Sequence, residues 1–426
     1  MTRRNPSMLA ATAILMFAVI TSSTHTYAGD DSEVASSPNA TITLSNFQAA
    51  AVVIGQVDFS GGAFNQGLAN PAADTASTGF GSIGVGPTGI LYLGDYSNQR
   101  VLGFNSVPSS NDANADFVLG QPNFTTSGQG TGSNQFGGPQ SPFVSNKMLF
   151  VSDFFNSRVL IWKKAPISDQ VKANIVIGQA KFGAPAPGCT AKNLSAPETL
   201  AVAGGKLVVA DSSNARVLIY KKIPKKNGAK ASIVLGQNNF TTCVTLNDGT
   251  GTSGSPSAAN LSYPAGVWTD GKRLVVTDED ESRVLIWNTF PKKNFQPADI
   301  VLGQPNFTSN VINNNGSNVT GSPSAKNMNM PYDGVFSNGT QLFVDDQKNQ
   351  RILIWNTFPT SNFQQADVVL GQPNFSCSVE NNDGTGCTGG APSANNLKNP
   401  TGIAQIGNQL IVADGGNNRF LIYNGL

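Results

Sequence analysis

Two short phrases recur six times along this chain. The first is an apolar segment that ends in Gly-Gln, as in VVIGQ at 52–56 and IVLGQ at 300–304. The second is an apolar segment ending in Asp, a polar turn and a segment that begins with Arg, as in LVVADSSNARVLIY at 207–220. Repeats of this length are supersecondary units that bury their apolar faces only by stacking on their neighbours. The arginines of the six copies are Arg100, Arg158, Arg216, Arg283, Arg351 and Arg419.

Each repeat contains four expected strands. A short strand after a proline (Gly89-Ile90, Gly266-Val267 and Gly402-Ile403) precedes the Asp strand, the Arg strand and the Gly-Gln strand. Runs such as Val-Leu-Ile-Trp are apolar on both faces, so both faces of each sheet need a cover. The pattern predicts an all-β fold, a six-bladed β-propeller of four-stranded blades. An open solenoid is the alternative, and it needs capping repeats that the sequence lacks.

The ends of the chain predict how the ring closes. The first Gly-Gln strand, near 48–56, precedes any complete repeat, and the last repeat stops at Leu426 after three strands. We expect the N-terminal strand to complete the last blade, because the ring then exposes no unpaired sheet edge. The propeller is expected to span residues 47–426.

The N-terminus reads as a targeting segment. Arg3 and Arg4 precede an apolar stretch at 8–20, and a polar run then ends in Thr-Tyr-Ala at 26–28. This order is typical of a cleavable secretory signal, here residues 1–28, with a retained anchor as the alternative. We expect 29–46 to be a flexible linker, the mature chain to lack a transmembrane segment, and the protein to be secreted or periplasmic.

The chain contains one histidine, His25, and it lies inside the expected signal. A mature chain without histidine has no Ser-His-Asp triad, no histidine-ligated zinc and no histidine general base. Whether the chain is an enzyme stays open, and the sequence favours a non-enzyme. The net charge of +1 falls close to zero once Arg3 and Arg4 are removed, which argues against a nucleic-acid partner.

Four cysteines predict two disulfides in an exported protein, although free thiols are an alternative and three pairings are possible. Cys377 and Cys387 share one Gly/Asn-rich loop, so we expect Cys377–Cys387, which leaves Cys189–Cys243.

The repeat resembles a known family. Pro400-x-Gly402-Ile403, an apolar strand ending in Asp414, and Asn417-x-Arg419 are similar to the NHL repeat, over about residues 48–426. The resemblance implies a propeller of the kind found in exported bacterial NHL proteins, and it implies no single function. The fourth repeat departs from the pattern, with Asp280-Glu281-Ser282 where Asn is expected. Because the Asp and Arg recur in every repeat, we interpret them as turn-forming rather than catalytic.

The residue after each proline is expected at the mouth of the central channel. Two of these positions carry the carboxyl groups of Glu198 and Asp333, which are weak candidates for an acid–base pair or a single metal site. The expected channel-mouth residues are Thr88, Gln140, Glu198, Ala265, Tyr332 with its neighbour Asp333, and Thr401.

Both faces of the ring carry further candidates. Long polar connections, such as 241–263 and 376–399, are expected on the same face as the Asp-Arg turns, where binding usually resides. Their Asp248 and Asp383 are weak candidates for calcium, although no calcium-loop spacing is present and no cofactor is expected. A basic arc is expected on the opposite rim and is suited to an acidic partner. Its residues are Lys163, Lys164, Lys221, Lys222, Lys225, Lys226, Lys292 and Lys293.

These features favour an exported, monomeric, non-enzymatic binding or scaffold propeller. Its long polar loops are expected to recognise a protein or a cell-envelope polysaccharide. One alternative is a calcium-dependent propeller hydrolase, lactonase or lyase that acts through the channel-mouth carboxyls. Another is a structural subunit of an envelope or extracellular assembly.

Overall fold

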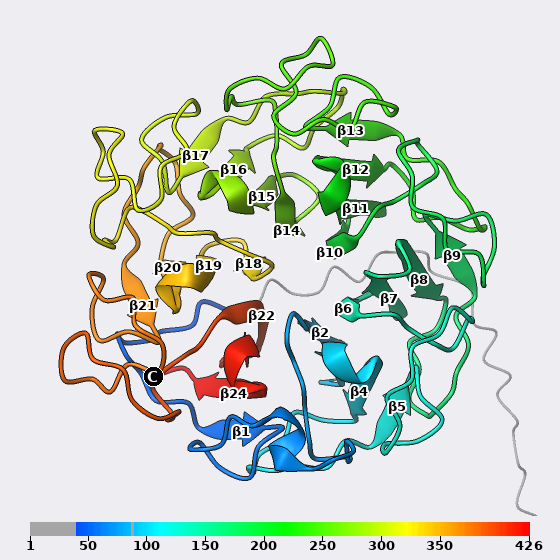
Figure 1. Ribbon diagram of the computed structural model, residues 1–426, viewed down its shortest axis with the longest axis vertical. Helices are drawn as coiled ribbons and strands as arrows, with labels where there is room; N and C mark the ends of the chain where they lie inside the picture. Colours follow the sequence, from blue (N-terminus) through cyan, green and yellow to red (C-terminus); the bar gives the residue numbers. More distant parts are fainter. Residues whose placement is uncertain (1–39, 87–88) are drawn as a thin grey trace, which may run out of the picture. The chain divides into compact units, whose positions relative to one another are not determined.

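The computed structural model describes residues 40–86 and 89–426, which form six four-stranded antiparallel sheets. The sheets stand as the blades of a propeller around a central axis, with the first strand of each blade nearest that axis (Figure 1). We call the region along this axis the central channel. The predicted fold class and the number of blades are both confirmed. In the described part of the chain, the helical segments are single 3₁₀ turns, and none is long or apolar enough to cross a membrane.

The first five blades follow the chain from the inner to the outer strand. Blade 1 consists of β2 (Ile83–Val85), β3 (Leu91–Asp95), β4 (Arg100–Phe104) and β5 (Phe117–Leu119). Blade 2 consists of β6 (Pro139–Ser145), β7 (Met148–Asp153), β8 (Arg158–Trp162) and β9 (Ile175–Ile177). Blade 3 consists of β10 (Pro197–Ala203), β11 (Lys206–Asp211), β12 (Arg216–Tyr220) and β13 (Ile233–Leu235).

The second half of the ring repeats this order. Blade 4 consists of β14 (Pro264–Thr269), β15 (Leu274–Asp278), β16 (Arg283–Trp287) and β17 (Ile300–Leu302). Blade 5 consists of β18 (Val335–Ser337), β19 (Leu342–Asp346), β20 (Arg351–Trp355) and β21 (Val368–Leu370). Blade 6 consists of β22 (Pro400–Ile406), β23 (Gln409–Asp414), β24 (Arg419–Asn424) and β1 (Val52–Ile54). The 3₁₀ turns are η1 (Phe64–Gly67), η2 (Tyr96–Asn98), η3 (Ser212–Asn214), η4 (Glu279–Glu281), η5 (Gln347–Asn349) and η6 (Gly415–Asn417).

Blade 6 joins the two ends of the chain. Strand β1 pairs antiparallel with β24, with Val52 opposite Ile422 and Ile54 opposite Phe420. The first described strand is therefore the outer strand of the last blade, as the sequence predicts. This pairing closes the ring without leaving the edge of β24 unpaired.

Blade 1 corrects one expectation. Its inner strand is β2, which ends at Val85, whereas the sequence pattern placed this strand at Gly89-Ile90. The backbone N–H of Gly86 donates to the carbonyl of Ile90, so Gly89 and Ile90 belong to the turn between β2 and β3. The inner strand of blade 1 therefore ends before Pro87, whereas β6, β10, β14 and β22 each begin with a proline. Thr88, which was assigned to the channel mouth on that basis, lies outside the described residues.

A buried Asp–Arg pair anchors each blade, as blade 3 shows. The Nε of Arg216 donates to Oδ2 of Asp211 at 2.6 Å, and both side chains are fully buried. Arg216 also donates to the carbonyls of Thr190 and Phe240, which belong to the connections that enter and leave the blade. Asp211 accepts the backbone N–H of Ser195. The pair therefore ties the turn to both connections, which supports the structural interpretation of the repeated residues.

The Gly-Gln phrase forms the turn at the end of each outer strand and stabilises it by hydrogen bonds. Gly236 has φ near +82°, and a Cβ there would lie 2.7 Å from the carbonyl oxygen of Ala215. The amide of Gln237 donates to that same carbonyl and to the carbonyl of Val244. Glycine allows the close approach, and glutamine satisfies the carbonyl that the turn leaves free.

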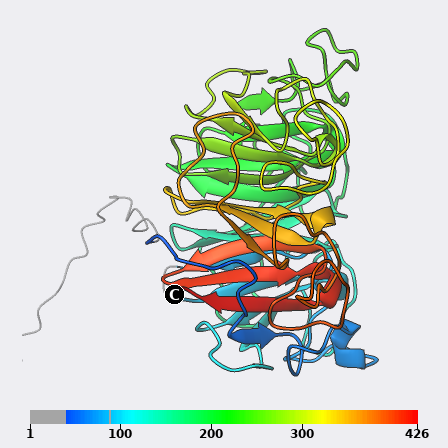
Figure 2. The ribbon, with the colours of Figure 1, turned by 90° about the vertical axis from the view of Figure 1, so that its left-hand side faces the viewer.

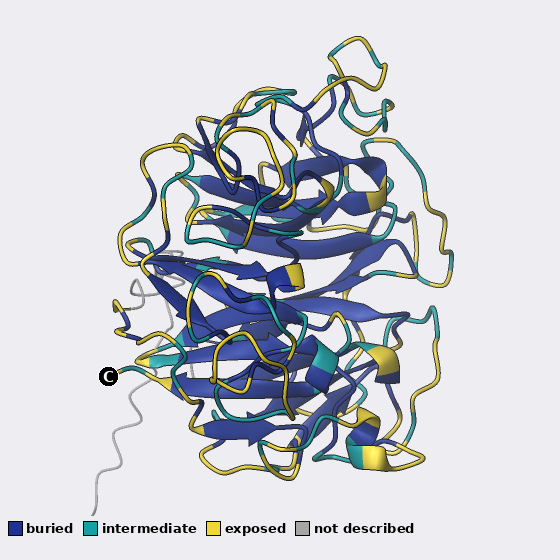
Figure 3. Cartoon of the chain, turned by 60° about the vertical axis from the view of Figure 1, so that its left-hand side comes forward, coloured by how far each residue is buried: buried dark blue, intermediate teal, exposed yellow. Residues whose placement is uncertain are grey.

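The apolar core is divided among the interfaces between blades. One cluster contains Val208 and Ile219 of blade 3 together with Val276 and Leu285 of blade 4, and five similar clusters occupy the other interfaces. The strands are buried and the exposed residues gather in the connections (Figure 3). Both faces of each sheet are therefore covered, which explains why the strand sequences do not alternate.

The antiparallel register defines two faces of the ring. Asp153 lies opposite Arg158, and Leu149 lies opposite Trp162, so the Asp-Arg turn and the turn after Trp162 stand at opposite ends of the blade. We call the face with the Asp-Arg turns the top face and the other the bottom face. The 3₁₀ turns lie on the right in Figure 2, and the C-terminus lies on the left. The arginine contacts with Thr190 and Phe240 place the long connections on the top face as well.

Part of the segment expected to be a linker packs against blades 5 and 6. Ile42 and Leu44 are buried in the cluster between these blades. The backbone N–H of Ile42 donates to the side chain of Gln341, and the N–H of Leu426 donates to the carbonyl of Thr43. The ordered domain thus includes residues before the expected boundary at 47.

Both expected disulfides are present. Cys189–Cys243 joins the connections on either side of blade 3, and Cys377–Cys387 closes a loop in the connection to blade 6. The predicted pairing is confirmed.

The packing of residues 42–44 predicts that removing them lowers the stability of the propeller. A chain that begins at residue 47 should unfold at lower urea concentration than one that begins at residue 40, because it loses two buried aliphatic side chains. The loss should be about 3 kcal/mol or more of unfolding free energy. Equal midpoints would show that the segment contributes nothing to stability.

The Asp–Arg pair predicts a second effect. Arg216→Met should lower the unfolding free energy by about 3–5 kcal/mol, because Asp211 is then left buried without its partner. The double variant D211L/R216M should recover part of that loss, since it removes the unpaired charge. Chemical denaturation measures both, and a single variant no less stable than wild type would contradict the role assigned to the pair.

Candidate functional site

Side chains from four blades meet in the centre of the channel near the top face. Gln140 is on β6, Glu198 is on β10, and Tyr332 and Asp333 precede β18. Tyr263, which the sequence analysis missed, precedes β14. Gln140, Glu198, Tyr332 and Asp333 are all buried. We call these five residues the central cluster.

Hydrogen bonds join the central cluster across the channel. Gln140 on blade 2 donates through Nε2 to Oδ2 of Asp333 on blade 5, at 2.8 Å. The hydroxyl groups of Tyr332 and Tyr263 donate to Oε1 of Glu198, at 2.8 and 2.9 Å. Blades that are not neighbours in the ring are therefore linked through their side chains. This part of the channel is occupied by polar groups.

Both carboxyl groups of the cluster resist ionisation. Burial raises the pKa of Glu198 to about 7, although the hydroxyl groups of Tyr332 and Tyr263 oppose the rise. Burial and the charge of Glu198 raise the pKa of Asp333 well above its ordinary value. In the described chain, none of the ion pairs includes either carboxyl group.

A hollow of about 380 Å³ lies above the cluster at the mouth of the channel. Phe80 is exposed, and its ring lies 5.5 Å from the rings of both Tyr96 and Tyr332. The ring of Tyr96 in turn lies 5.6 Å from that of the exposed Phe155. The mouth thus presents aromatic surface beside polar groups. The residues that line the hollow are Phe80, Tyr263, Glu279, Asp280, Tyr332, Gln347 and Lys348.

Some of these residues carried no signal in the sequence. Phe80 reaches the mouth because the inner strand of blade 1 begins earlier than expected. Asp345 precedes the paired Asp346 and accepts the backbone N–H groups of Tyr332 and Gly334, so it holds the cluster segment in place.

Thr401, which the sequence analysis placed at the channel mouth, is buried and donates to the carbonyl of Gly81. It therefore contributes to packing between blades rather than to the central cluster.

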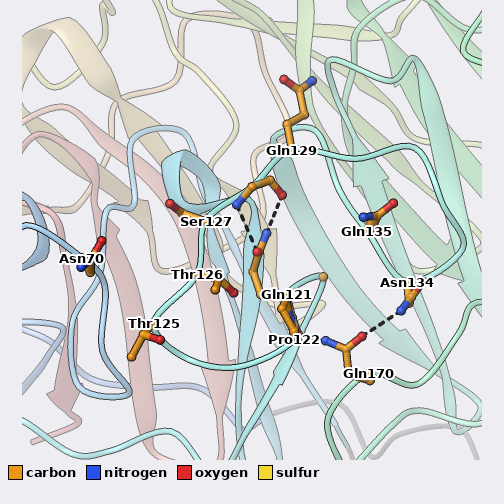
Figure 4. A pocket seen from close by; sticks show the side chains of 12 residues that line it. Asn70, Gln121, Pro122, Thr125, Thr126, Ser127, Gln129, Asn134, Gln135 and Gln170 are labelled. Carbon is orange, nitrogen blue, oxygen red and sulfur yellow. Dashed lines mark hydrogen bonds between the residues drawn. The ribbon is translucent and has the colours of Figure 1, made fainter.

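A second pocket, of about 630 Å³, lies on the rim between blades 1 and 2 (Figure 4). Its lining is polar and uncharged, and much of it is already hydrogen bonded within the protein. Gln121 exchanges hydrogen bonds with the backbone of Gly128, and Asn134 donates to Gln170. The pocket contains neither an aromatic ring nor a charged group among its lining residues.

The two acidic loop residues do not come together. Asp248 is exposed and accepts the backbone N–H and the hydroxyl group of Thr250, and Asp383 does the same with Thr385. These hydrogen bonds lower the pKa of both carboxyl groups. Over residues 40–86 and 89–426, no group of three or more His, Cys, Asp and Glu side chains is placed to hold a metal ion.

The basic arc lies on the bottom face, in the turns after β8, β12 and β16, and all eight of its lysines are exposed. Lys147, Lys230 and Lys272 extend it on the same three blades. No ion pair between described residues engages any of these lysines. The bottom turns of blades 1, 5 and 6 contain no lysine, so the positive charge is confined to one half of that face.

Comparison with solved structures finds chains that are similar to this one. No protein-family model and no curated protein matches the chain. A chain of the nidogen/laminin complex is similar over 66% of this chain and 72% of its own length, at 16% identity and a TM-score of 0.35. A protein of unknown function from Bacteroides thetaiotaomicron is similar over 88% of this chain and 75% of its own length, at 12% identity and a TM-score of 0.46.

Glu279 at the hollow predicts a pH effect. Burial and the neighbouring charges of Glu198 and Asp280 raise its pKa from 4.5 to about 8. Between these values the folded protein keeps a proton that the unfolded chain releases, so the unfolding free energy falls as pH rises through this window. Glu279→Gln should therefore stabilise the protein more above pH 8 than near pH 5. Denaturation of both proteins across this range measures the difference, and parallel pH profiles would contradict the raised pKa.

Proposed function

We propose that the protein is an exported, non-enzymatic binding propeller that recognises a cell-envelope polysaccharide at the mouth of its channel. The observation that carries this proposal is the hollow on the top face, where the exposed ring of Phe80 stands beside carboxyl, hydroxyl and amide groups. Concave sites lined by aromatic side chains with a few convergent polar groups are typical ligand sites.

The chemistry of the mouth favours a sugar chain over a protein ligand. The flat rings of Phe80 and Phe155 offer apolar surfaces on which the C–H face of a sugar can lie. Glu279, Asp280 and Gln347 offer acceptors and donors for its hydroxyl groups. The long polar loops around the top face extend the surface outward, which suits a polymer.

The burial of the central cluster supports binding over catalysis. Glu198 is fully buried and Asp333 is 4% exposed, with Glu198 held by the hydroxyl groups of Tyr332 and Tyr263. A hydrolase or lyase that used these carboxyls would need them in contact with its substrate. In the arrangement described here, both tyrosines line the hollow above them.

We further propose that the repeat is of the NHL type and that the chain is exported behind a signal at 1–28, which lies outside the described residues. Two disulfides are compatible with an oxidising compartment such as the periplasm or the cell exterior. The concentration of lysines on blades 2 to 4 favours a second contact, in which the bottom face meets an acidic polymer.

An array of microbial cell-envelope polysaccharides tests the proposal. Phe80→Ala should weaken binding by about tenfold, the effect of losing one aromatic contact. Phe64→Ala is the matched control, because Phe64 is 49% exposed and does not line the hollow.

The same array distinguishes binding at the top face from binding at the bottom face, and it distinguishes binding from enzymatic cleavage. K225E/K226E should leave neutral polysaccharides bound and reduce only acidic ones, since it changes the bottom face alone. Saturable binding by wild type that F80A does not weaken would remove the top-face site from the proposal. Shortened or chemically altered polysaccharide after incubation would favour the enzyme alternative.

A further inference from the structure

We propose that the central cluster holds a divalent cation of the calcium type, bound by carboxyl oxygens of Glu198 and Asp333 and by the amide oxygen of Gln140. The site lies beneath the hollow and does not depend on what the hollow binds. The starting observation is that three acceptor atoms in this cluster, Oε2 of Glu198, Oδ1 of Asp333 and Oε1 of Gln140, are buried without a hydrogen-bond partner.

These three atoms belong to one connected group. Gln140 Nε2 lies 2.8 Å from Oδ2 of Asp333 and 3.4 Å from the hydroxyl oxygen of Tyr332, which donates to Oε1 of Glu198. Each unpartnered oxygen is bonded to the same carbon as an atom of this network. When Asp333 is ionised, as it is with a bound cation, this donation also fixes which end of the Gln140 amide is oxygen, since the reverse orientation would place two acceptors together.

The donors present in the cluster are already used. Tyr263 and Tyr332 both donate to Oε1 of Glu198, and Gln140 donates to Oδ2 of Asp333. The hydroxyl group of Ser212, which lies beside Glu198, donates to the carbonyl of Pro264. Among the described residues, no lysine or arginine forms an ion pair with either carboxyl group. Two neighbouring buried carboxyl groups without a cation are costly, because each disfavours the charge of the other.

A shared proton or a single water molecule would leave at least one of the three oxygens without a hydrogen-bond partner. A proton shared between the two carboxyl groups pairs their free oxygens and leaves Oε1 of Gln140 without a partner. A water molecule has two hydrogens for three acceptors. A cation bound by all three oxygens would satisfy them together and would also offset the carboxylate charges.

The donor set indicates which cation. Carboxylate and amide oxygens are hard ligands, the class that calcium takes in flexible geometry, with water completing its six to eight ligands. Zinc prefers nitrogen and sulfur ligands, which this cluster lacks. The site contains only two carboxyl groups and an amide, so it is smaller than a cluster of three acidic groups, and weak binding is expected.

Calorimetry and thermal unfolding of the full chain, stripped with EDTA, test the site with calcium chloride alone. About 10 mM calcium, at least ten times the dissociation constant of a weak extracellular site, should raise the Tm by about 2 °C. Glu198→Gln should weaken calcium binding at least tenfold. Gln140→Glu should strengthen it, because a carboxylate replaces the neutral amide oxygen, and this variant decides the question if E198Q does not fold.

The matched control is D248N/D383N, which removes the two exposed loop carboxyl groups and should leave calcium affinity unchanged. The proposal is overturned if wild type shows neither heat nor a Tm shift with calcium. It is also overturned if E198Q or Q140E binds calcium as wild type does, or if the loop variant abolishes binding. None of these results bears on polysaccharide binding at Phe80, so the two proposals fail separately.

Discussion

The pairing of β1 with β24 is the interaction on which the rest of the structure depends. A blade buries its apolar faces only against two neighbours, and the ring provides two neighbours for every blade once it is closed. The buried segment around Ile42 and the hydrogen bond from Leu426 to Thr43 strengthen the same junction. The channel and its central cluster exist only because the first described strand completes the last blade.

Within the closed ring, repeated and unique residues have different roles. The Asp–Arg pairs and the Gly-Gln ends occur in every blade and connect turns to the long connections, so they maintain the framework. In the central cluster, Gln140, Glu198 and Tyr332 occupy the equivalent position after a proline in three blades, whereas Tyr263 precedes a proline and Asp333 follows Tyr332. The repeated framework therefore places different side chains from different blades together at the centre of the ring.

The two proposals address different depths of the channel. The aromatic mouth is open and offers a surface to an extended ligand. The carboxyl groups beneath it are buried, and their hydrogen-bond network joins blades 2, 3, 4 and 5. A cation at that level would link these blades further, which would make the surface above it more rigid without taking part in ligand contact.

The repeat by itself determined the fold class, the number of blades and the closing strand, because strand patterns are local properties that recur. The loop shared by Cys377 and Cys387 predicted one disulfide and left the other two cysteines to form the second. The repeat also indicated Gln140, Glu198 and Tyr332, which directly follow a proline, together with Asp333 next to Tyr332. Tertiary structure alone decided the rest. The earlier inner strand of blade 1 brought Phe80 to the mouth, and contacts across the ring made one cluster from residues far apart in the sequence. Such contacts depend on how six blades converge on one axis, and the spacing of residues along the chain does not give the distances between them in the folded ring.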